Sequence, residues 1–317
     1  MRCKCRRKLV RNGFTFSGTQ RWKCLVCSYT QTRQKHVKPN TLLLTKYLIE
    51  GQTVSWLSHH YHLHPNTIRA KIFKELSVPP PTSLISLPKG KIWIATDATH
   101  FKSWGCLYIT KATGVSSPIA VSFCRRECLE TALTHLKPLS GLAVDGYTTD
   151  GRKGLVMAHK QTFPDGAHQR CLIHIQMRVA TLLTQHPKLN AGRDLLYISS
   201  QLNQIKDYYS AEIWFLAFQD WSEQYHAMLK KRTFQKDGKW WYTHRNLRYA
   251  WKHILNAADN LFIFLDYKNS THHNNHLEGT FGQRKPTLFK HRGLSRTKIA
   301  AALIWTFHLL ANSKKNI

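Results

Sequence analysis

Acidic residues are scarce in this chain of 317 residues, and nearly all of them lie in its middle. The first 49 residues contain 12 Lys and Arg but no Asp or Glu. After Glu278 there are eight more basic residues and again no acid. The net charge is +30 and the isoelectric point is about 10.1. So basic a protein requires a polyanionic partner, and nucleic acid is the simplest candidate.

Long hydrophobic runs are also missing. The longest apolar stretch, residues 299–311, contains Thr306 and His308 and is shorter than the roughly 18 residues of a membrane span. No apolar segment at the N-terminus resembles a signal peptide. An anionic membrane surface is a weaker candidate partner, because the charge is spread along the whole chain. We therefore expect a cytoplasmic, nucleoid-associated protein that does not enter a membrane.

The chain has eight cysteines, which should be reduced in the cytoplasm unless they bind metal. Four of them form a CxC…CxxC pattern, with turn signals and a short predicted strand, residues 19–23, between the two pairs. Four thiolates on two turns suit tetrahedral zinc, which would also stabilise a segment too short to have a core. Four free thiols are the alternative. We predict a zinc ribbon over residues 1–35, with ligands Cys3, Cys5, Cys24 and Cys27.

Apolar spacing behind the cysteines predicts three helices. One covers residues 40–50, a second follows a cap at Thr53, and a third begins at Pro65 or the next residue. This is the layout of a helix-turn-helix domain, here residues 36–78, whose last helix enters the major groove of DNA. A plain three-helix bundle with a basic face is the alternative. The expected inward-facing residues are Ile68 and Ile72, and the expected DNA contacts are Asn66, Thr67, Arg69 and Lys71.

A proline-rich linker, residues 79–90, precedes a stretch with a different pattern. Strands are predicted at residues 91–97, 106–110, 118–123, 142–149 and 167–171, with helices at residues 128–139 and 152–160. Three antiparallel strands followed by alternating helix and strand is the order of a ribonuclease-H-like core, which we assign to residues 91–317. The predicted fold class is therefore α/β, with a helical insertion in the core and the zinc ribbon and helix-turn-helix in front.

Two acids are expected on neighbouring strands of this core. Asp97 lies near the centre of the first strand, and Asp150 follows the end of the fourth. Two close carboxylates repel each other unless a cation lies between them. Mg²⁺ binds one or two carboxylates together with phosphate oxygens, and a pair of such ions can serve phosphodiester chemistry. Asp145 is the alternative second acid, but we expect it to form a turn with Gly146.

A third acid is then expected from a later helix, and Glu278 is the candidate. Ser270 or Thr271 would cap that helix. Taken alone, Glu278 could equally be an acid favoured by the helix dipole. Positive charge suited to phosphate groups follows it along the chain, at Arg284, Lys285 and Arg292.

The motifs in their order resemble a known family. They are the cysteine pattern, the three helices, TDATHFK around Asp97, TTDGRKG around Asp150, QRCLIH and NNHLEG. Together they resemble the bacterial insertion-sequence transposases of the Mutator-like DDE family, over nearly the whole chain. The resemblance implies a catalytic triad of Asp97, Asp150 and Glu278 that holds two Mg²⁺ or Mn²⁺ ions. It also places Cys171 and His174 near the active site, as packing residues or DNA contacts.

The activity that this resemblance implies is DNA transposition. Such an enzyme binds the terminal inverted repeats of its element, cuts the DNA to expose 3′ hydroxyls and joins them to target DNA by two-metal-ion transesterification. We expect it to act on double-stranded DNA as a homodimer or a higher oligomer. Two alternatives stay open: a ribonuclease-H-like nuclease that cuts without joining, and an inactive DNA-binding regulator.

A helical insertion is predicted at about residues 187–259, which are rich in helix formers and aromatic residues. Most of these aromatic side chains should form its core. Trp240, Trp241 and Tyr242 differ, because Lys and Arg flank them close to Gly238. A basic aromatic tip of this kind could stack on an unpaired base at a cut DNA end.

Overall fold

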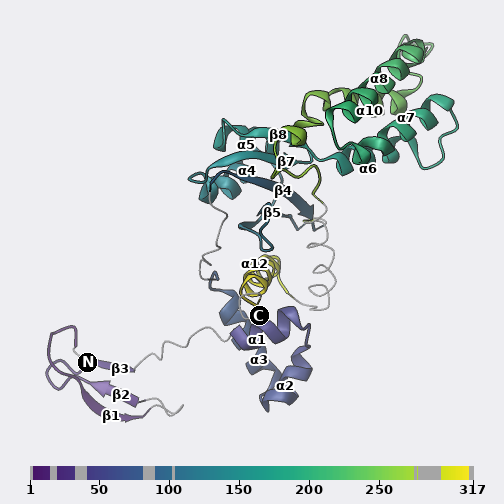
Figure 1. The fold of residues 1–317 in the computed structure, drawn as a ribbon. Coiled ribbons are helices and arrows are strands. Elements are labelled where there is room, and N and C mark those ends of the chain that lie inside the picture. Colours follow the sequence, from purple (N-terminus) through teal and green to yellow (C-terminus); the bar gives the residue numbers. More distant parts are fainter. Residues whose placement is uncertain are drawn as a thin grey trace. The chain divides into compact units, whose positions relative to one another are not determined.

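The computed structural model describes residues 3–14, 20–32, 41–80, 90–101, 104–274, 277 and 294–313. Contacts divide the chain into two compact units, residues 1–43 and residues 44–317, and each is described by itself. Figure 1 labels the helices and strands along the chain.

The first unit is a small antiparallel sheet of three strands. It comprises β1 (Val10–Phe14), β2 (Gln20–Lys23) and β3 (Thr30–Thr32), in that order. The strand predicted before the second cysteine pair is confirmed as β2. Buried side chains are few: Leu9 packs with Cys3 and Cys24, and Trp22 partly covers them. A core of this size leaves the cysteines as the main source of order in the unit.

The predicted helices follow, beginning with α1 (Thr41–Leu44) and the π-helical segment η1 (Thr45–Ile49). They continue with α2 (Val54–Tyr61) and α3 (Pro65–Leu76). The Thr53 side chain caps α2 by accepting a hydrogen bond from the Trp56 amide at 3.1 Å. Ile68 and Ile72 are buried, as predicted.

A helix from the far end of the chain, α12 (Arg296–Ser313), packs against η1 and α3 (Figure 1). Trp305 Nε1 donates a hydrogen bond to the Val78 carbonyl at 2.9 Å, and Lys298 Nζ lies 3.4 Å from the centre of the Phe73 ring. The apolar stretch at residues 299–311 is thus a helix packed against protein. Within the described part of the chain, no helix has both the length and the apolar character needed to cross a membrane.

A mixed sheet of five strands, in the order β6-β5-β4-β7-β8, forms the centre of the second unit. The central strand β4 pairs antiparallel with β5 and parallel with β7. Strand β6 extends the antiparallel side and β8 the parallel side. The strands are β4 (Ile92–His100), β5 (Cys106–Ala112), β6 (Ala120–Cys124), β7 (Val144–Thr149) and β8 (Ala167–Arg170).

All five predicted strands of this sheet are confirmed, with bounds that shift by a few residues. Two helices, α4 (Leu129–Leu136) and α5 (Lys153–Thr162), share one apolar core with the sheet. The short helix η2 (Lys137–Leu139) follows α4. The first strand runs to His100, beyond the predicted end, because it keeps pairing with β5 past Asp97. Asp97 therefore lies inside a strand that hydrogen bonds hold on both sides.

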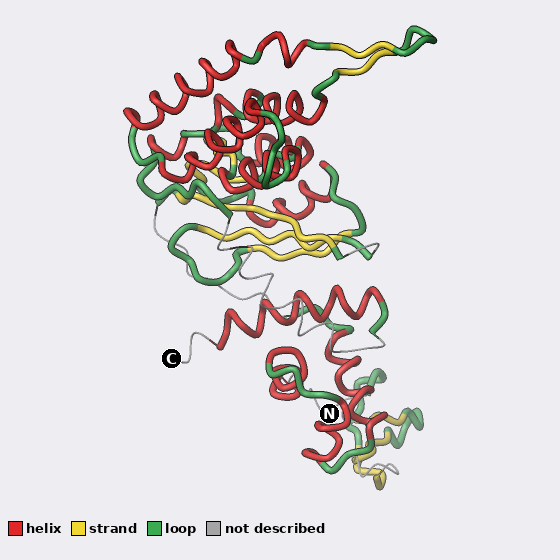
Figure 2. The backbone as a smooth tube through the Cα atoms, turned by 90° about the vertical axis from the view of Figure 1, so that its right-hand side faces the viewer, coloured by secondary structure: helices red, strands yellow, loops and turns green. Residues whose placement is uncertain are grey.

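The remaining helices pack around a second apolar core that includes Trp214, Phe218 and Trp221. The helices are α6 (Leu172–Leu183), α7 (Asn190–Ser200), α8 (Tyr208–Gln224), α9 (His226–Lys230) and α10 (Arg245–Leu255), with short helices η3 (Gln201–Gln204), η4 (Ala258–Asn260) and η5 (Ile263–Asp266). A two-stranded hairpin of β9 (Arg232–Phe234) and β10 (Trp240–Tyr242) projects from them (Figure 2).

Buried histidines hold the sheet together through threonine hydroxyls. Thr96 Oγ1 lies 2.9 Å from His159 Nε2 and 2.9 Å from Thr110 Oγ1. Thr110 Oγ1 in turn lies 2.8 Å from His135 Nε2. On the parallel side, His168 Nε2 lies 2.9 Å from Thr149 Oγ1. Since Thr96 and Thr149 directly precede Asp97 and Asp150, this network fixes the backbone that carries the two candidate acids.

We expect these histidines to make the fold sensitive to acid. Burial lowers the pKa of His135 to about 3, of His159 to about 4 and of His168 to about 3. The unfolded chain, with ordinary pKa values near 6.5, then binds more protons as the pH falls from about 6.5 to 4. Each histidine should cost up to about 1.4 kcal/mol of unfolding free energy per pH unit in that window.

Thermal melts between pH 7 and pH 5 (from about 0.5 unit above to about 1.5 units below an ordinary histidine pKa) would measure this loss. His159→Gln keeps a side-chain amide near Thr96 but cannot gain a proton. The variant should therefore show a clearly flatter dependence of Tm on pH than the unmodified protein. Equal slopes for the two proteins would contradict the assignment.

Candidate active site

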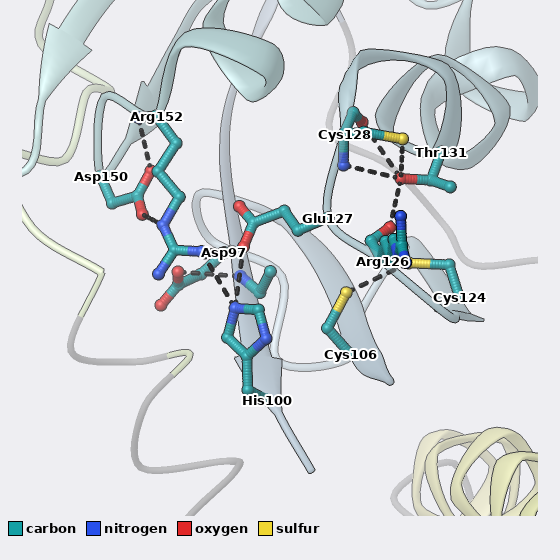
Figure 3. Close-up of polar contacts among 11 residues, drawn as sticks. Asp97, His100, Cys106, Cys124, Arg126, Glu127, Cys128, Thr131, Asp150 and Arg152 are labelled. Atoms are coloured by element: carbon teal, nitrogen blue, oxygen red, sulfur yellow. Dashed lines mark hydrogen bonds and ion pairs between the residues drawn. The ribbon is translucent and has the colours of Figure 1, made fainter. Parts of the chain in front are cut away.

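Parallel pairing of β4 with β7 brings Asp97 and Asp150 next to each other. Ala95 pairs with Thr148, so the same register carried forward by two residues sets Asp97 opposite Asp150. Neighbouring strands lie about 4.8 Å apart. In Figure 3 the two carboxylates belong to one group of polar side chains at this edge of the sheet. The sequence prediction that the two acids meet on neighbouring strands agrees with this register.

Both carboxylates are oriented by hydrogen bonds. Asp97 is 6% exposed, and its Oδ1 accepts a hydrogen bond from the Ala98 amide at 2.8 Å. Asp150 Oδ1 accepts one from the Arg152 amide at 2.9 Å, and its Oδ2 lies 3.0 Å from Arg152 Nε. The Asp150 side chain is only 12% exposed. The two acids are thus held in place and largely shielded from water.

Gly151 allows the turn that carries Asp150. Its φ is +82°, a conformation that side-chain-bearing residues rarely adopt, and a Cβ there would lie 1.9 Å from Arg170 Cζ. The Arg170 guanidinium therefore packs directly against this glycine. Burial lowers the pKa of Arg170, while the nearby Asp150 carboxylate acts in the opposite direction. A partly buried cation thus lies against the Asp150 turn.

A cluster of three polar side chains, Glu127, Arg152 and His100, lies beside Asp97 and Asp150 and was not predicted from the sequence. Arg152 Nη1 donates a short hydrogen bond to Glu127 Oε2. His100 Nε2 lies 2.9 Å from the same carboxylate oxygen and 2.9 Å from Arg152 Nη1. The Glu127 side chain is 8% exposed, and its Oε1 is buried without a hydrogen-bond partner among the described residues. Arg152 therefore links Glu127 to Asp150 (Figure 3).

One sequence signal could have identified Glu127. It is one of only 17 acids in the chain, and it follows two arginines immediately before the helix predicted at residues 128–139. Its partners, however, come from β4 and from the turn after β7, so only the folded chain shows what it binds.

The chain returns to the sheet shortly before Glu278. Thr148 Oγ1 donates a short hydrogen bond to the Thr271 carbonyl. Asn274 is fully buried, and its Nδ2 donates to the carbonyl of Thr96 at 3.4 Å. Asn274 precedes Glu278 by four residues, so the segment leading to the predicted third acid is anchored next to Asp97. The predicted residues Glu278, Arg284, Lys285 and Arg292 lie outside the residues that the structure describes.

The predicted helix cap before Glu278 is wrong. Residues 271–274 are not helical, and Ser270 Oγ donates instead to the carbonyls of Phe264 and Tyr267. Hydrogen bonds tie this segment to the sheet and to the N-terminus of α6, where the Leu172 amide donates to the His272 carbonyl at 2.9 Å, and it forms no helix.

The turn predicted for Asp145 and Gly146 is also wrong, because both residues lie inside β7. A Cβ at Gly146 would lie 2.3 Å from Trp93 Cζ3, so the glycine makes room for the Trp93 ring. Asp145 forms an ion pair with Lys91 at 3.6 Å. Five residues of strand, about 16 Å, separate it from Asp150. Asp145 therefore lies at the opposite end of the strand from the Asp97–Asp150 pair.

Cys171 joins three parts of the site, whereas His174 lies one turn further into α6. The Cys171 side chain is buried, its amide donates to the Thr149 carbonyl at 2.8 Å, and its Sγ accepts from the Asn274 amide at 3.3 Å. Packing beneath the acids, one of the two expected roles for Cys171, agrees with these contacts.

The four N-terminal cysteines form a separate cluster. Cys3 Sγ lies 3.4 Å from Cys27 Sγ, and Cys5 Sγ lies 3.5 Å from Cys24 Sγ and 3.6 Å from Cys27 Sγ. All four sulfur atoms lie within 4.8 Å of one another. Tetrahedral zinc with Zn–S distances of about 2.3 Å requires sulfur atoms about 3.8 Å apart. Hydrogen bonds from the amides of Cys27 and Val26 lower the pKa of Cys24 to about 6. The cluster is compatible with zinc.

The predicted DNA-contacting residues share the outer face of α3. Arg69 Nη1 donates a hydrogen bond to Asn66 Oδ1 at 2.8 Å, which orders both side chains. The buried Ile68 and Ile72 point to the opposite side. The exposed polar residues on this helix include Asn66, Thr67, Arg69 and Lys71.

Comparison with known families adds an independent finding. Residues 126–275 match the family model described as "Transposase, Mutator family". The matched segment contains Glu127, Asp150, Cys171 and His174, and it ends just after Asn274. No curated protein matches the chain. Over these residues, the match supports the resemblance to Mutator-family transposases that the sequence motifs suggested, while Asp97, Glu278 and the N-terminal cysteines lie outside it.

Proposed function

We propose that this chain, whose residues 126–275 match the model of the Mutator family of transposases, is a DNA transposase. It would bind the terminal inverted repeats of its insertion sequence, cut the DNA to expose 3′ hydroxyls and join them to target DNA. The observation that carries the proposal is the register of β4 and β7, which sets Asp97 beside Asp150 within a basic protein.

A ribonuclease-H-like core is part of this proposal. Its support is the strand order β6-β5-β4-β7-β8, with an antiparallel side made by the first three strands in the chain and a parallel side made by the last two. In such a sheet the acids of the first and fourth strands are neighbours. Glu278 would complete the triad, since the chain leading to it is fixed beside Asp97 through Asn274.

The donor atoms at the site fit the expected metal. Asp97 and Asp150 offer carboxylate oxygens, which Mg²⁺ and Mn²⁺ prefer, and buried Glu127 Oε1 adds an oxygen that lacks a partner among the described residues. Two ions held by Asp97, Asp150 and Glu278 would supply charge stabilisation for attack on a phosphodiester and for the leaving oxygen.

The protein's own groups would bind and orient the DNA around these acids. The Arg152 side chain orients Asp150 and is still 54% exposed, so a phosphate oxygen can reach its guanidinium. Glu127 fixes that guanidinium from the other side. His100, at the end of β4, shares the same contacts. These three residues would place the phosphate next to the carboxylates.

The N-terminal elements would select the DNA sequence. We propose a zinc ribbon with ligands Cys3, Cys5, Cys24 and Cys27, followed by a helix-turn-helix in which α3 enters the major groove. The outer face of α3 carries the four predicted contacts, and its opposite face buries the two isoleucines. The expected substrate is double-stranded DNA, and pairing of two element ends calls for a homodimer or a higher oligomer.

A strand-transfer assay tests the function. The purified protein, Mg²⁺ and a labelled duplex that carries the inverted repeat flanking the coding sequence should yield both cut ends and products joined to a target plasmid. Cut ends without joined products would identify a nuclease. Binding of the repeat with neither product would identify a regulator.

Removing residues 1–78 should separate sequence recognition from general affinity for DNA. The shortened protein should bind DNA with a steep dependence on salt, because phosphate contacts dominate that binding. It should no longer prefer the inverted repeat over unrelated DNA in a competition assay. Since α12 packs on α3 and would lose its partner, a point variant is the matched test: Arg69→Ala should reduce the preference and leave the fold intact. If both proteins still select the repeat, the assignment of the helix-turn-helix is wrong.

A further inference from the structure

The hairpin of β9 and β10 has two different aromatic faces, because successive side chains of a strand point to opposite sides. On one face, Trp240 and Tyr242 lie edge to face with ring centres 5.3 Å apart. Arg232 stacks 4.0 Å above the Trp240 ring, and Arg248 stacks 4.0 Å above the Tyr242 ring. Trp241 belongs to the opposite face and is 43% exposed.

Trp241 forms one wall of a cavity of about 710 Å³ at the base of the hairpin. Sites for small ligands usually have volumes of about 300–1,000 Å³. The loop between α6 and α7 contributes Pro187 and Lys188 to the lining, and the residues after Trp241 contribute Tyr242, Thr243, His244, Arg245 and Asn246. The cavity therefore combines an accessible aromatic face with cationic groups at its rim.

Charge around the cavity indicates which ligand it accepts. Residues 226–252 contain eight Lys and Arg and a single acid, Asp237. An aromatic wall and a basic rim suit a molecule that has a flat aromatic part and a negative part, as a nucleotide does. The volume of the cavity suits one nucleotide. That nucleotide has to be unpaired, because a base within a duplex has both faces covered by its neighbours and cannot stack on a side chain.

We propose that this cavity binds an unpaired nucleotide of DNA, with its base stacked on Trp241 and its phosphate beside Lys188 and Arg245. The proposal rests on the proposed function for the source of the nucleotide, which would be a DNA end at the element boundary. It assigns Trp241, which lines the cavity and has no arginine stacked on it among the described contacts, to a ligand. Trp240 is equally exposed, at 44%, but Arg232 stacks on its ring and it does not line the cavity, and the Tyr242 ring, which does line it, carries Arg248.

The test compares two DNA ligands on the full-length protein without added Mg²⁺, so that no cutting occurs. One ligand is a short blunt duplex, and the other is the same duplex with a single-stranded extension of a few nucleotides that contains 2-aminopurine. Fluorescence anisotropy gives Kd for each, and quenching of 2-aminopurine reports stacking. Trp241→Ala should weaken binding of the extended DNA about 5- to 100-fold, remove the quenching and leave the blunt duplex unaffected.

Two further variants make the result specific. Trp241→Phe keeps an aromatic face and should retain most of the preference for the extended DNA. Tyr209→Ala removes an aromatic residue that is 74% exposed on α8, away from the cavity, and should change neither Kd nor quenching. Trp241→Ala with an unchanged Kd ratio, or with an equal loss for both ligands, would overturn the proposal.

The outcome is separate from that of the proposed function. If Trp241→Ala removes the preference but the protein neither cuts nor joins the inverted repeat, the cavity binds unpaired DNA in a protein that is not a transposase. If the protein transposes and Trp241→Ala keeps both the preference and the quenching, the transposase proposal stands and the nucleotide site is rejected.

Discussion

Asp97→Asn and Asp150→Asn are each expected to abolish Mg²⁺-dependent cutting and joining, with a loss of at least about 10³-fold, or about 4 kcal/mol in the activation free energy. The amide keeps the shape of the side chain but removes the charge that attracts a divalent cation. The same loss is expected for Glu278→Gln. DNA binding, measured by anisotropy, should remain, because none of these side chains carries positive charge.

Asp145→Asn is the matched control for Asp150→Asn. Both acids come from the same stretch of chain, but Asp145 forms an ion pair with Lys91 and lies at the other end of β7. Asp145→Asn should therefore cut a labelled inverted repeat at nearly the normal rate. Activity in Asp150→Asn together with inactivity in Asp145→Asn would reverse the choice of second acid. An active Glu278→Gln would remove Glu278 from the triad.

Removal of zinc is expected to unfold the N-terminal unit and leave the rest of the chain folded. Metal binding is worth about 10–16 kcal/mol in small structural zinc sites, and the buried apolar residues here are too few to replace it. Purified protein should contain about one zinc per chain by elemental analysis. Cys24→Ser should lose the zinc and the protection of backbone amides in residues 3–32 from hydrogen exchange.

Cys128→Ser provides the comparison for the zinc experiment. Cys128 is an exposed thiol at the start of α4, in the other unit of the chain. Its replacement by serine should therefore leave the zinc content of the protein unchanged. Protein without zinc whose first 32 residues still resist exchange would contradict the metal assignment. So would a Cys24→Ser variant that keeps the metal.

Local patterns in the sequence were sufficient to predict most of the secondary structure. The strands that became β4 and β7 were predicted from local patterns, and apolar spacing also predicted the helices around Thr53 and Ile68. The spacing of the cysteines predicted that their sulfur atoms meet, because two short turns can bring them together without help from the rest of the chain. Such features depend on neighbours in the sequence, so the sequence alone determines them.

The failures come from contacts that are distant along the chain. Asp145 and Gly146 read as a turn, yet the packing of the Trp93 ring against Gly146 keeps both residues in β7. Ser270 and Thr271 read as helix caps, yet residues 271–274 form no helix and are tied by hydrogen bonds to the sheet and to α6. The tertiary contacts outweighed the local preference in both places.

The sequence by itself determined the charge, the fold class, the cysteine cluster and the two strand acids of this protein. Only the tertiary structure decided which groups surround those acids. Glu127, His100 and Arg152 come from three separate segments, and their ion pairs exist only because β4 lies between β5 and β7. The cavity beside Trp241 likewise needs the α6–α7 loop, more than 50 residues earlier in the chain. Side chains that meet through folding leave no spacing pattern in the sequence, which is why reading the sequence could not reveal them.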